Sequence, residues 1–193
     1  MPRAGLNRAQ VVARAAALAD DIGLERLTLA SVAKDLGVRL PSLYNHIEGL
    51  EALHRELSML ALRELAGRLG AAAVGRAGKD ALDATADAYR AYALRFPGRY
   101  TATVKAPAPD DDDHNDAAKA VLHVVMSVLH GYGLAGDQAI HAVRELRASL
   151  HGWADLEKTG AFGMPQDVDV SYQRLIDHLH VSLTQYAAEP VTR

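Results

Sequence analysis

The sequence predicts an all-helical protein of 193 residues. Apolar residues recur every three or four positions along most of the chain, which is the period of a helix with one buried face. No segment shows the strict alternation of apolar and polar residues that a half-buried strand needs. Capping residues such as Asn7 and Thr28 precede the apolar runs, and glycines such as Gly23 and Gly37 follow them.

The first helix is predicted from about Arg8 to Ile22, with Asn7 as its cap and Gly23 at its end. Its apolar face is formed by Val11, Ala15, Leu18 and Ile22. A second, shorter helix follows Thr28 and ends at Gly37. Its inward residues are Leu29, Val32, Ala33 and Leu36.

A third short helix is predicted within GVRLPSLYNHI, residues 37–47, and begins at Pro41, where a missing N–H costs nothing. Only Leu43 and Ile47 point inward. Two short helices separated by a glycine-containing turn form the outline of a helix-turn-helix unit. The outward side chains of the third helix suit phosphates and base edges, and they are Arg39, Ser42, Tyr44, Asn45 and His46.

The rest of the chain is predicted to contain further helices. A long one follows Gly49 and fades near Gly70, and the others span about 79–96, 116–132, 137–158 and 169–188. The segment PAPDDDDHND, residues 107–116, is predicted to be a loop.

Residues 8–57 resemble the DNA-binding segment of TetR-family transcriptional repressors. The resemblance depends on three linked features: Leu27-Thr28, the run from Val32-Ala33 to Leu36-Gly37-Val38, and Leu43-Tyr44-x-His46. The C-terminal half resembles the WHG-type regulatory domain of a subset of this family. The matching residues are His151-Gly152, Leu156-Glu157, Gly160-x-Phe162 and Asp169-x-Ser171.

The resemblance implies a role for each DNA-facing residue. Thr28, Tyr44 and His46 are expected to bind phosphates. Leu40, Pro41, Ser42 and Asn45 are expected to face base edges, with Asn45 suited to adenine and the apolar pair suited to a thymine methyl group. Arg39 is expected to reach either a guanine or a phosphate.

One position departs from the family pattern. The family usually has a Lys at the start of the fourth helix, and this chain has Leu50 there, between Glu48 and Glu51. We expect weaker anchoring to the DNA backbone at this point, offset by Arg3 and Arg8 near the N-terminus. The same departure leaves open an alternative, in which the protein is a ligand-binding or scaffold protein with a degenerate DNA-binding head.

Two domains are predicted: a DNA-binding domain at residues 1–48, joined by the helix at 49–70 to a ligand-binding and dimerisation domain at 71–193. Residues 1–46 contain six Lys/Arg and four Asp/Glu, whereas the remainder has an excess of acids. A basic head on an acidic body is typical of a nucleic-acid module joined to another domain.

The second domain is expected to bind a small-molecule effector and to form a homodimer. The pocket candidates are polar or aromatic residues on apolar helical faces: Tyr89, Tyr92, Met126, His130, Trp153 and Phe162. The last two helices carry wide apolar stripes, which pack within one chain, against a second subunit, or both. The resemblance favours a four-helix dimer interface, with Val143, Leu150, Leu175, Leu179 and Leu183 as its candidate residues.

Other chemistries find little support in the sequence. It contains no Cys, no nucleophile motif, no phosphate-binding glycine loop and no metal-peptidase motif, so an enzyme is not expected. The aspartates of residues 110–113 and the scattered histidines lack metal-ligand spacing, and no cofactor or metal is predicted. No apolar run is long enough to span a membrane or act as a signal peptide, which predicts a cytoplasmic protein.

Overall fold

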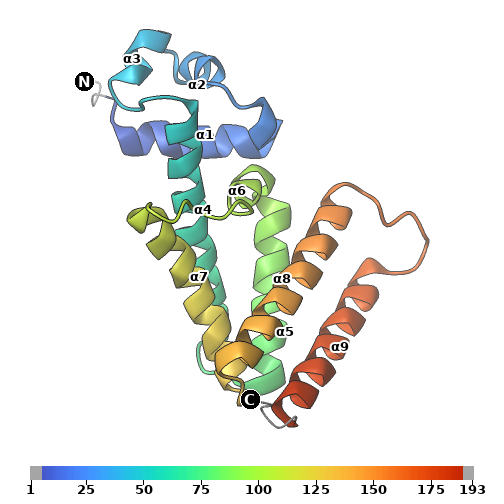
Figure 1. Cartoon of the computed structure of the whole chain (residues 1–193). Helices are drawn as coiled ribbons and strands as arrows, with labels where there is room; N and C mark the ends of the chain where they lie inside the picture. The colour runs from blue at the N-terminus through green and yellow to red at the C-terminus, as the bar shows by residue number, and fades with distance from the viewer. Residues whose placement is uncertain (1–5, 189–193) are drawn as a thin grey trace. The chain divides into compact units, whose positions relative to one another are not determined.

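The computed structural model describes residues 6–188, and all the secondary structure in that part of the chain is helical. Figure 1 shows the helices α1 (Arg8–Ile22), α2 (Leu29–Leu36), α3 (Leu40–Tyr44), α4 (Leu50–Ala73), α5 (Gly78–Arg95), α6 (Pro97–Ala102), α7 (Asp112–His130), α8 (Gly136–Lys158) and α9 (Val168–Ala188), with a 3-10 turn at Leu24–Arg26. None of the helices between residues 6 and 188 has the length and apolarity that crossing a bilayer requires. The all-helical prediction is confirmed.

The predicted helix ends agree closely with the structure where a cap is encoded locally. The Asn7 side chain accepts a hydrogen bond from the Gln10 N–H, and Thr28 does the same for Ser31. Gly37 has φ 67°, the left-handed conformation that ends α2 without the steric cost a side chain would add.

The predicted loop at residues 107–116 is partly wrong, because α7 begins at Asp112. The Oδ1 atom of Asp111 accepts the N–H of His114 at 3.2 Å, and the Asp111 carbonyl accepts the N–H of Asn115 at 2.9 Å. Asp111 therefore caps α7. Aspartates in the first turn also suit the positive end of the helix dipole, so the acidic run starts a helix instead of preventing one.

Packing divides the chain into two compact units. The first contains residues 1–64 and 95–118, and the second contains residues 65–94 and 119–193. This grouping places α6 and the first turns of α7 with the three N-terminal helices, so it differs from the functional domains predicted at 1–48 and 71–193. The chain passes from one unit to the other inside α4 and again inside α7.

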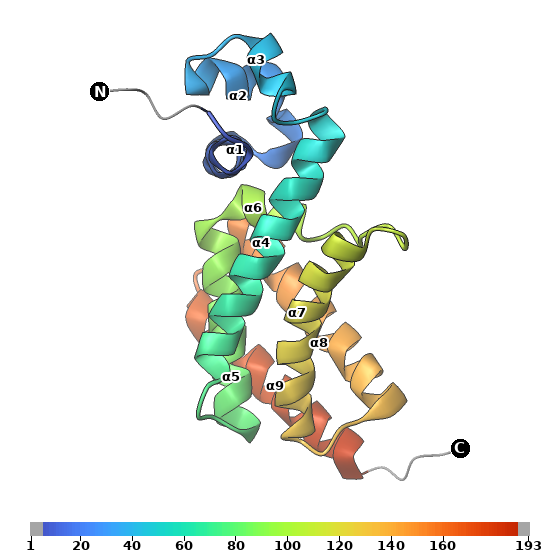
Figure 2. The ribbon, with the colours of Figure 1, turned by 90° about the vertical axis from the view of Figure 1, so that its left-hand side faces the viewer.

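In the first unit, α1, α2 and α3 surround the beginning of α4 (Figures 1 and 2) and share one apolar core. Leu43 and Ile47, the predicted inward residues, have 0% and 1% of their surface exposed. α6 lies against α1, where a Cβ atom on Gly98 would be 2.1 Å from the carbonyl oxygen of Ala19. The Arg99 N–H donates to Asp20 Oδ1 at 2.9 Å, so a carboxylate of α1 caps α6.

In the second unit, α5, α8 and α9 contribute most of the core. Its fully covered side chains include Leu129, Leu134, Ile176 and Leu183. Tyr172 of α9 donates its hydroxyl hydrogen to the Ala86 carbonyl of α5 at 2.7 Å. The Ser182 hydroxyl donates to Glu145 at 3.0 Å and joins α9 to α8.

Gly98→Ala is expected to destabilise the protein by about 1–3 kcal/mol, because the added methyl group meets the backbone of α1 and cannot be accommodated by a side-chain rotation. Gly67→Ala is the matched control. Gly67 is also helical, but a Cβ atom there meets nothing within 4 Å, so the better helix propensity of Ala should stabilise α4 by up to about 1 kcal/mol. Urea unfolding followed by circular dichroism measures both changes, and the same sign for the two variants would contradict the close contact.

Candidate nucleic-acid interface

Thr28 holds the start of α2 while leaving a hydrogen-bond donor at the surface. Its Oγ1 atom accepts the Ser31 N–H at 3.0 Å, and the Ser31 hydroxyl oxygen accepts the Thr28 N–H at 3.0 Å. These two bonds form a capping box. Thr28 is exposed, and no described residue accepts its hydroxyl hydrogen. It can therefore donate to a phosphate oxygen while it caps the helix, as the sequence predicts.

α3 presents the other predicted DNA contacts on one continuous surface. Leu43 and Ile47 fix the inner side of the segment in the core, so the side chains between and beside them face outward. Arg39, Pro41, Tyr44 and Asn45 are exposed, with 54% of Tyr44 accessible, and Leu40, Ser42 and His46 are partly exposed. α2 and α3 pack against each other, which places Thr28 and this surface on one rigid element.

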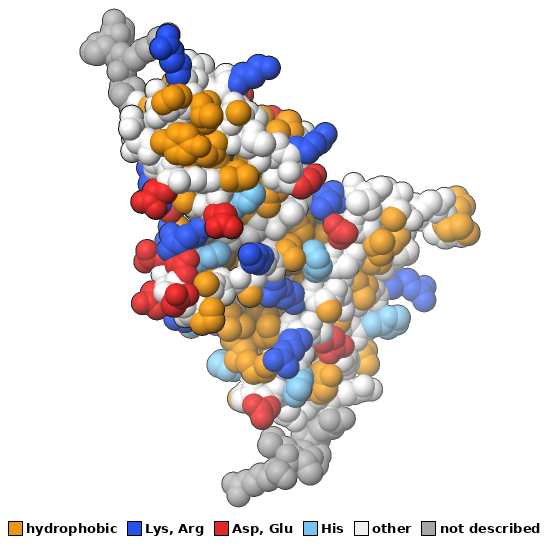
Figure 3. All heavy atoms as spheres, turned by 45° about the horizontal axis from the view of Figure 1, so that its top comes forward, with side chains coloured by type: hydrophobic (Ala, Val, Ile, Leu, Met, Phe, Trp, Pro, Cys, Tyr) orange, Lys and Arg blue, Asp and Glu red, His pale blue; other side chains and the backbone are white. Residues whose placement is uncertain are grey.

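The charges of the head are divided between internal pairs and exposed cations. Arg14 of α1 donates hydrogen bonds from Nε and Nη2 to the Asp35 carboxylate of α2, and Arg8 binds Glu56 of α4 at 2.6 Å. Arg26, Lys34 and Arg39 are exposed and have no carboxylate partner among residues 6–188. Figure 3 shows hydrophobic side chains gathered on the head, with Lys and Arg side chains above and to the right of them and Asp and Glu side chains below. A surface of this kind suits base methyl groups in the centre and phosphates at the edge.

The internal pairing of Arg8 bears on one expectation from the sequence, and its contact with DNA stays a prediction. Arg8 was predicted to replace the missing cation at the start of α4, but its guanidinium is bound by Glu56. Arg3 lies outside the described residues. Glu48, Leu50 and Glu51 are all exposed at the start of α4, with 36% of Leu50 accessible. This part of the surface therefore carries no positive charge.

The predicted effector-pocket residues are distributed unevenly. Trp153 and Phe162 lie together, with ring centroids 4.6 Å apart, and the Tyr172 ring lies 5.4 Å from that of Trp153 in a tilted arrangement. Tyr92 has 1% of its surface exposed and Tyr89 and Met126 are half-buried. His130 is exposed at the end of α7, so it lacks the enclosure that the sequence led us to expect.

A partly buried cation that sequence reasoning missed contacts this aromatic group. Arg90 of α5 donates two hydrogen bonds to Glu157, at 2.7 and 2.5 Å, and a third to Asp169 at 2.7 Å. These bonds raise the pKa of Arg90 above its ordinary value. Its guanidinium also covers the Tyr172 ring at 4.6 Å. The resemblance had singled out both acidic partners, but nothing in the local sequence pairs them with Arg90, which is 67 positions from Glu157 and 79 from Asp169.

Two of the candidate dimer residues are covered within one chain. Leu179 and Leu183 have 4% and 0% of their surface exposed, so almost none remains for a partner, and their assignment to the interface is corrected. Val143, Leu150 and Leu175 are half-buried and stay predictions. On α9 the large apolar side chains that reach solvent are Val170 and Val181, at 59% and 52%.

The acidic segment before α7 is more than a solvated loop. Arg55 of α4 binds Asp111 through two hydrogen bonds of 2.5 Å each, which lower the pKa of Asp111 to about 2. A hollow of about 620 Å³ is lined by Arg55, Ala108 and Asp110–Asp113. Residues 6–188 contain no group of three or more side chains placed to hold a metal ion.

Comparison with known proteins gives a family assignment. Residues 82–179, about half of the chain, match the model of the tetracyclin repressor-like C-terminal domain. The chain is 38% identical over 167 residues to the HTH-type transcriptional regulator Rv0681 of Mycobacterium tuberculosis, covering 86% of this chain and 75% of that protein. The chain belongs to the TetR family.

Two further matches agree with this TetR assignment. The HTH-type regulator YobS of Bacillus subtilis is 35% identical over 168 residues, covering 86% of this chain and 87% of YobS. A solved TetR variant from Acinetobacter baumannii AYE in complex with minocycline has the same fold, with a TM-score of 0.72 at 20% identity and coverage of 96% of this chain and all of that one.

Thr28→Asp is expected to leave the fold intact and to weaken DNA binding. Asp caps helices at least as well as Thr, so the free energy of unfolding should change by less than about 0.5 kcal/mol. The added carboxylate repels a phosphate where the hydroxyl would donate to it, so DNA affinity should fall at least about tenfold. Thr28→Asn is the control, because it caps α2 without adding charge. Denaturant unfolding and fluorescence anisotropy with labelled DNA measure the two effects, and equal DNA affinities for Asp and Asn would contradict a phosphate contact at this position.

Proposed function

We propose that the protein is a ligand-responsive transcriptional repressor that binds a near-palindromic operator as a homodimer. The observation that carries this proposal is the α3 surface: seven of the eight residues from Arg39 to His46, all except the buried Leu43, remain accessible on a segment anchored by its opposite side. Membership of the TetR family and the names of its relatives, which are HTH-type transcriptional regulators, support a DNA-binding role.

The DNA contacts divide into two kinds. Thr28, Tyr44 and His46 offer hydroxyl and imidazole groups to phosphates, which fix the position of the head but carry no sequence information. Asn45 and the apolar side chains of Leu40 and Pro41 are suited to base edges in the major groove. Two heads related by a two-fold axis would read half-sites about 34–36 Å apart, one turn of DNA.

Dimerisation is proposed through the last two helices. α9 leaves Val170 and Val181 exposed, and the half-buried Val143, Leu150 and Leu175 lie on α8 and α9. A symmetric interface would cover these apolar side chains twice, once in each subunit.

The effector is proposed to bind in the second unit, near the aromatic group of Trp153 and Phe162. The structural neighbour with minocycline bound supports small-molecule binding by this fold. A ligand releases DNA only if it binds the non-DNA-binding conformation more tightly, because equal affinity for both conformations shifts no equilibrium.

Selection from a random pool of double-stranded DNA by the immobilised full-length protein tests the proposal. A near-palindromic consensus with half-sites one helical turn apart is expected. Recovery of no consensus would rule out sequence-specific DNA binding and favour the alternative of a ligand-binding or scaffold protein. The exposed Glu48, Leu50 and Glu51 are the structural argument for that alternative.

Substitutions in α3 should separate affinity from specificity. Tyr44→Ala and His46→Ala are expected to weaken binding to all DNA sequences alike, because phosphate contacts are common to all of them. Asn45→Ala should relax the preference at one base pair per half-site by roughly 1–3 kcal/mol. Anisotropy titrations against the selected operator and single-base variants distinguish the two patterns, and three variants with wild-type affinity would rule out α3 as the reading element.

A substitution at the exposed apolar surface of α9 tests the dimer. Val181→Glu should give monomers, because a symmetric interface would bury two unpaired carboxylates. Val181 is 52% exposed within one chain, so the fold of each subunit is expected to survive, whereas charge at the covered Leu183 would disrupt the core. Light scattering at micromolar concentration decides the point: a wild-type monomer, or a dimeric variant, counts against pairing through this surface of α9.

A further inference from the structure

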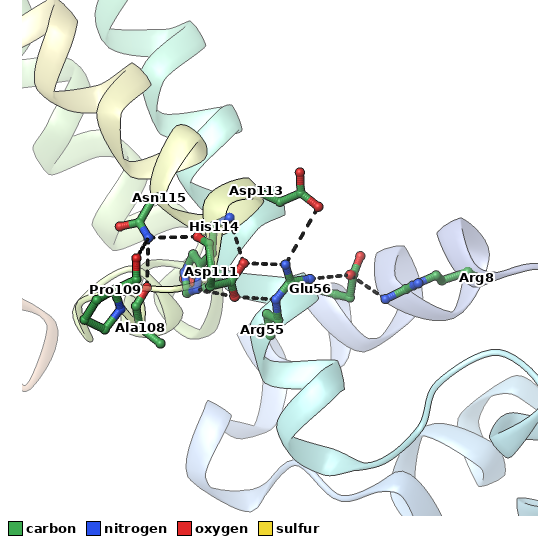
Figure 4. A network of polar contacts seen from close by, with 10 residues as sticks. Arg8, Arg55, Glu56, Ala108, Pro109, Asp111, Asp113, His114 and Asn115 are labelled. Carbon is green, nitrogen blue, oxygen red and sulfur yellow. Dashed lines mark hydrogen bonds and ion pairs between the residues drawn. The ribbon is translucent and has the colours of Figure 1, made fainter.

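A charged contact joins the first turn of α7 to α4, away from the surface proposed to bind DNA. Arg55 Nε donates to Asp111 Oδ2, and Arg55 Nη2 donates to Asp111 Oδ1, each at 2.5 Å (Figure 4). This fork-to-fork geometry fixes orientation as well as distance. The two side chains are 34% and 17% exposed, so solvent screens the pair only in part.

The same guanidinium continues into a chain of charges that reaches α1. Arg55 Nη1 is 3.4 Å from Glu56 Oε1, and the same oxygen accepts a hydrogen bond from Arg8 Nη2 at 2.6 Å. Figure 4 shows these residues in line, with Arg8 at the end that belongs to α1. Asp111, Arg55, Glu56 and Arg8, here called the charge relay, thus connect α7, α4 and α1.

A second, buried contact lies beside the relay. His114 Nε2 is 2.7 Å from Ser58 Oγ, and the two residues are 9% and 4% exposed. His114 stands three positions after Asp111, and Ser58 stands three positions after Arg55. Because both spacings are three residues, the Asp111–Arg55 and His114–Ser58 contacts lie one helical turn apart in the same interface. The first turn of α7 is therefore held to α4 at two points.

The relay also has a path to the helix-turn-helix. Arg8 begins α1, and Arg14, further along α1, binds Asp35 of α2, the helix that Thr28 caps. Ion pairs thus connect Glu56 of α4 to the start of α1, and α1 to α2. None of the four relay residues is among the proposed DNA contacts.

We propose that Asp111 and Arg55 are positioning residues for DNA binding, acting through Glu56 and Arg8 on the placement of α1 and α2. This inference rests on the proposed function. Without the Asp111 carboxylate, Arg55 keeps Glu56 as its nearest acidic partner and competes for it with Arg8. The start of α1 then loses its anchor, and the helix-turn-helix spends less time in the conformation that fits the groove.

Asp111→Asn removes the negative charge of this residue and keeps its role as the cap of α7. Asp111 also caps α7, and Asn is an equally good cap, so the helix start is retained. Asp110→Asn is the matched control, because Asp110 is an exposed neighbour and loses the same charge. Removal of an acidic charge by itself should strengthen attraction to DNA, so a weakened Asp111→Asn variant cannot be explained by net charge.

The experiment measures the affinity of each full-length variant for the operator selected by the wild-type protein. Asp111→Asn and Arg55→Gln are expected to bind about two- to fivefold more weakly, the range of a partly exposed ion pair. The double variant should be no weaker than either single one, because both remove the same contact. Asp110→Asn should bind as well as the wild type or better.

Two further readouts separate positioning from a DNA contact and from general loss of stability. The slope of log affinity against log salt should stay unchanged in Asp111→Asn, since no phosphate contact is lost. Hydrogen exchange of the free protein should speed up at the first turns of α1 in Asp111→Asn but not in Asp110→Asn, with circular dichroism showing both variants folded.

The outcomes separate the two proposals. Equal operator affinities for Asp111→Asn and Asp110→Asn, or unchanged exchange in α1, would overturn the positioning role while leaving DNA binding intact. A wild-type protein that selects no DNA overturns both proposals.

Discussion

The head of this protein depends on one constraint: α3, at five residues, is too short to be stable as an isolated helix. It persists because Leu43 and Ile47 are buried among α1, α2 and α4. Leu43 within α3 and Ile47, three residues after the end of that helix, lie at helical spacing, so they use only one side of this short segment. The same packing that stabilises α3 therefore leaves its opposite side available, and the chemistry of that side can serve recognition without a cost to the core.

The distribution of charge follows from the same need for rigidity. Cations that hold helices together are paired with carboxylates, as in Arg14 with Asp35 and Arg99 with Asp20 at 3.0 Å. Arg26, Lys34 and Arg39 have no such partner among the described residues and remain able to attract phosphates. In the sequence the head has only a modest excess of cations. In the folded state the paired cations are neutralised by their carboxylates, and the unpaired ones remain to attract phosphates.

Sequence reasoning succeeded where the cause is local and failed where it is distant. Asn7, Thr28 and Gly37 act within one turn of their own positions, so the ends of α1 and α2 could be predicted. Apolar spacing likewise identified Leu43 and Ile47 as core. The start of α7 was missed, because a run of aspartates indicates a loop unless the capping role of Asp111 and its pairing with Arg55 are known.

The candidate sites show the same limit. An apolar stripe predicts that a side chain is covered but not which element covers it, so Leu179 and Leu183 were assigned to a dimer interface although their own chain buries them. Arg90 was missed because its partners, Glu157 and Asp169, come from distant parts of the chain. The α3 surface was predictable because its residues, between Arg39 and His46, lie within eight consecutive positions.

α7 is divided between the two packing units, and the charge relay holds the end of α7 that belongs to the first unit. Residues 112–118 of α7 belong with the head, and residues 119–130 belong with the unit that contains the aromatic group. A continuous helix resists bending, because a kink needs a proline, a bulge or an inserted group, and α7 contains no proline. α4 offers a second continuous connection, and Arg55 lies where the two meet. The ion pair between Arg55 and Asp111 therefore holds the start of α7 to α4 within the first unit.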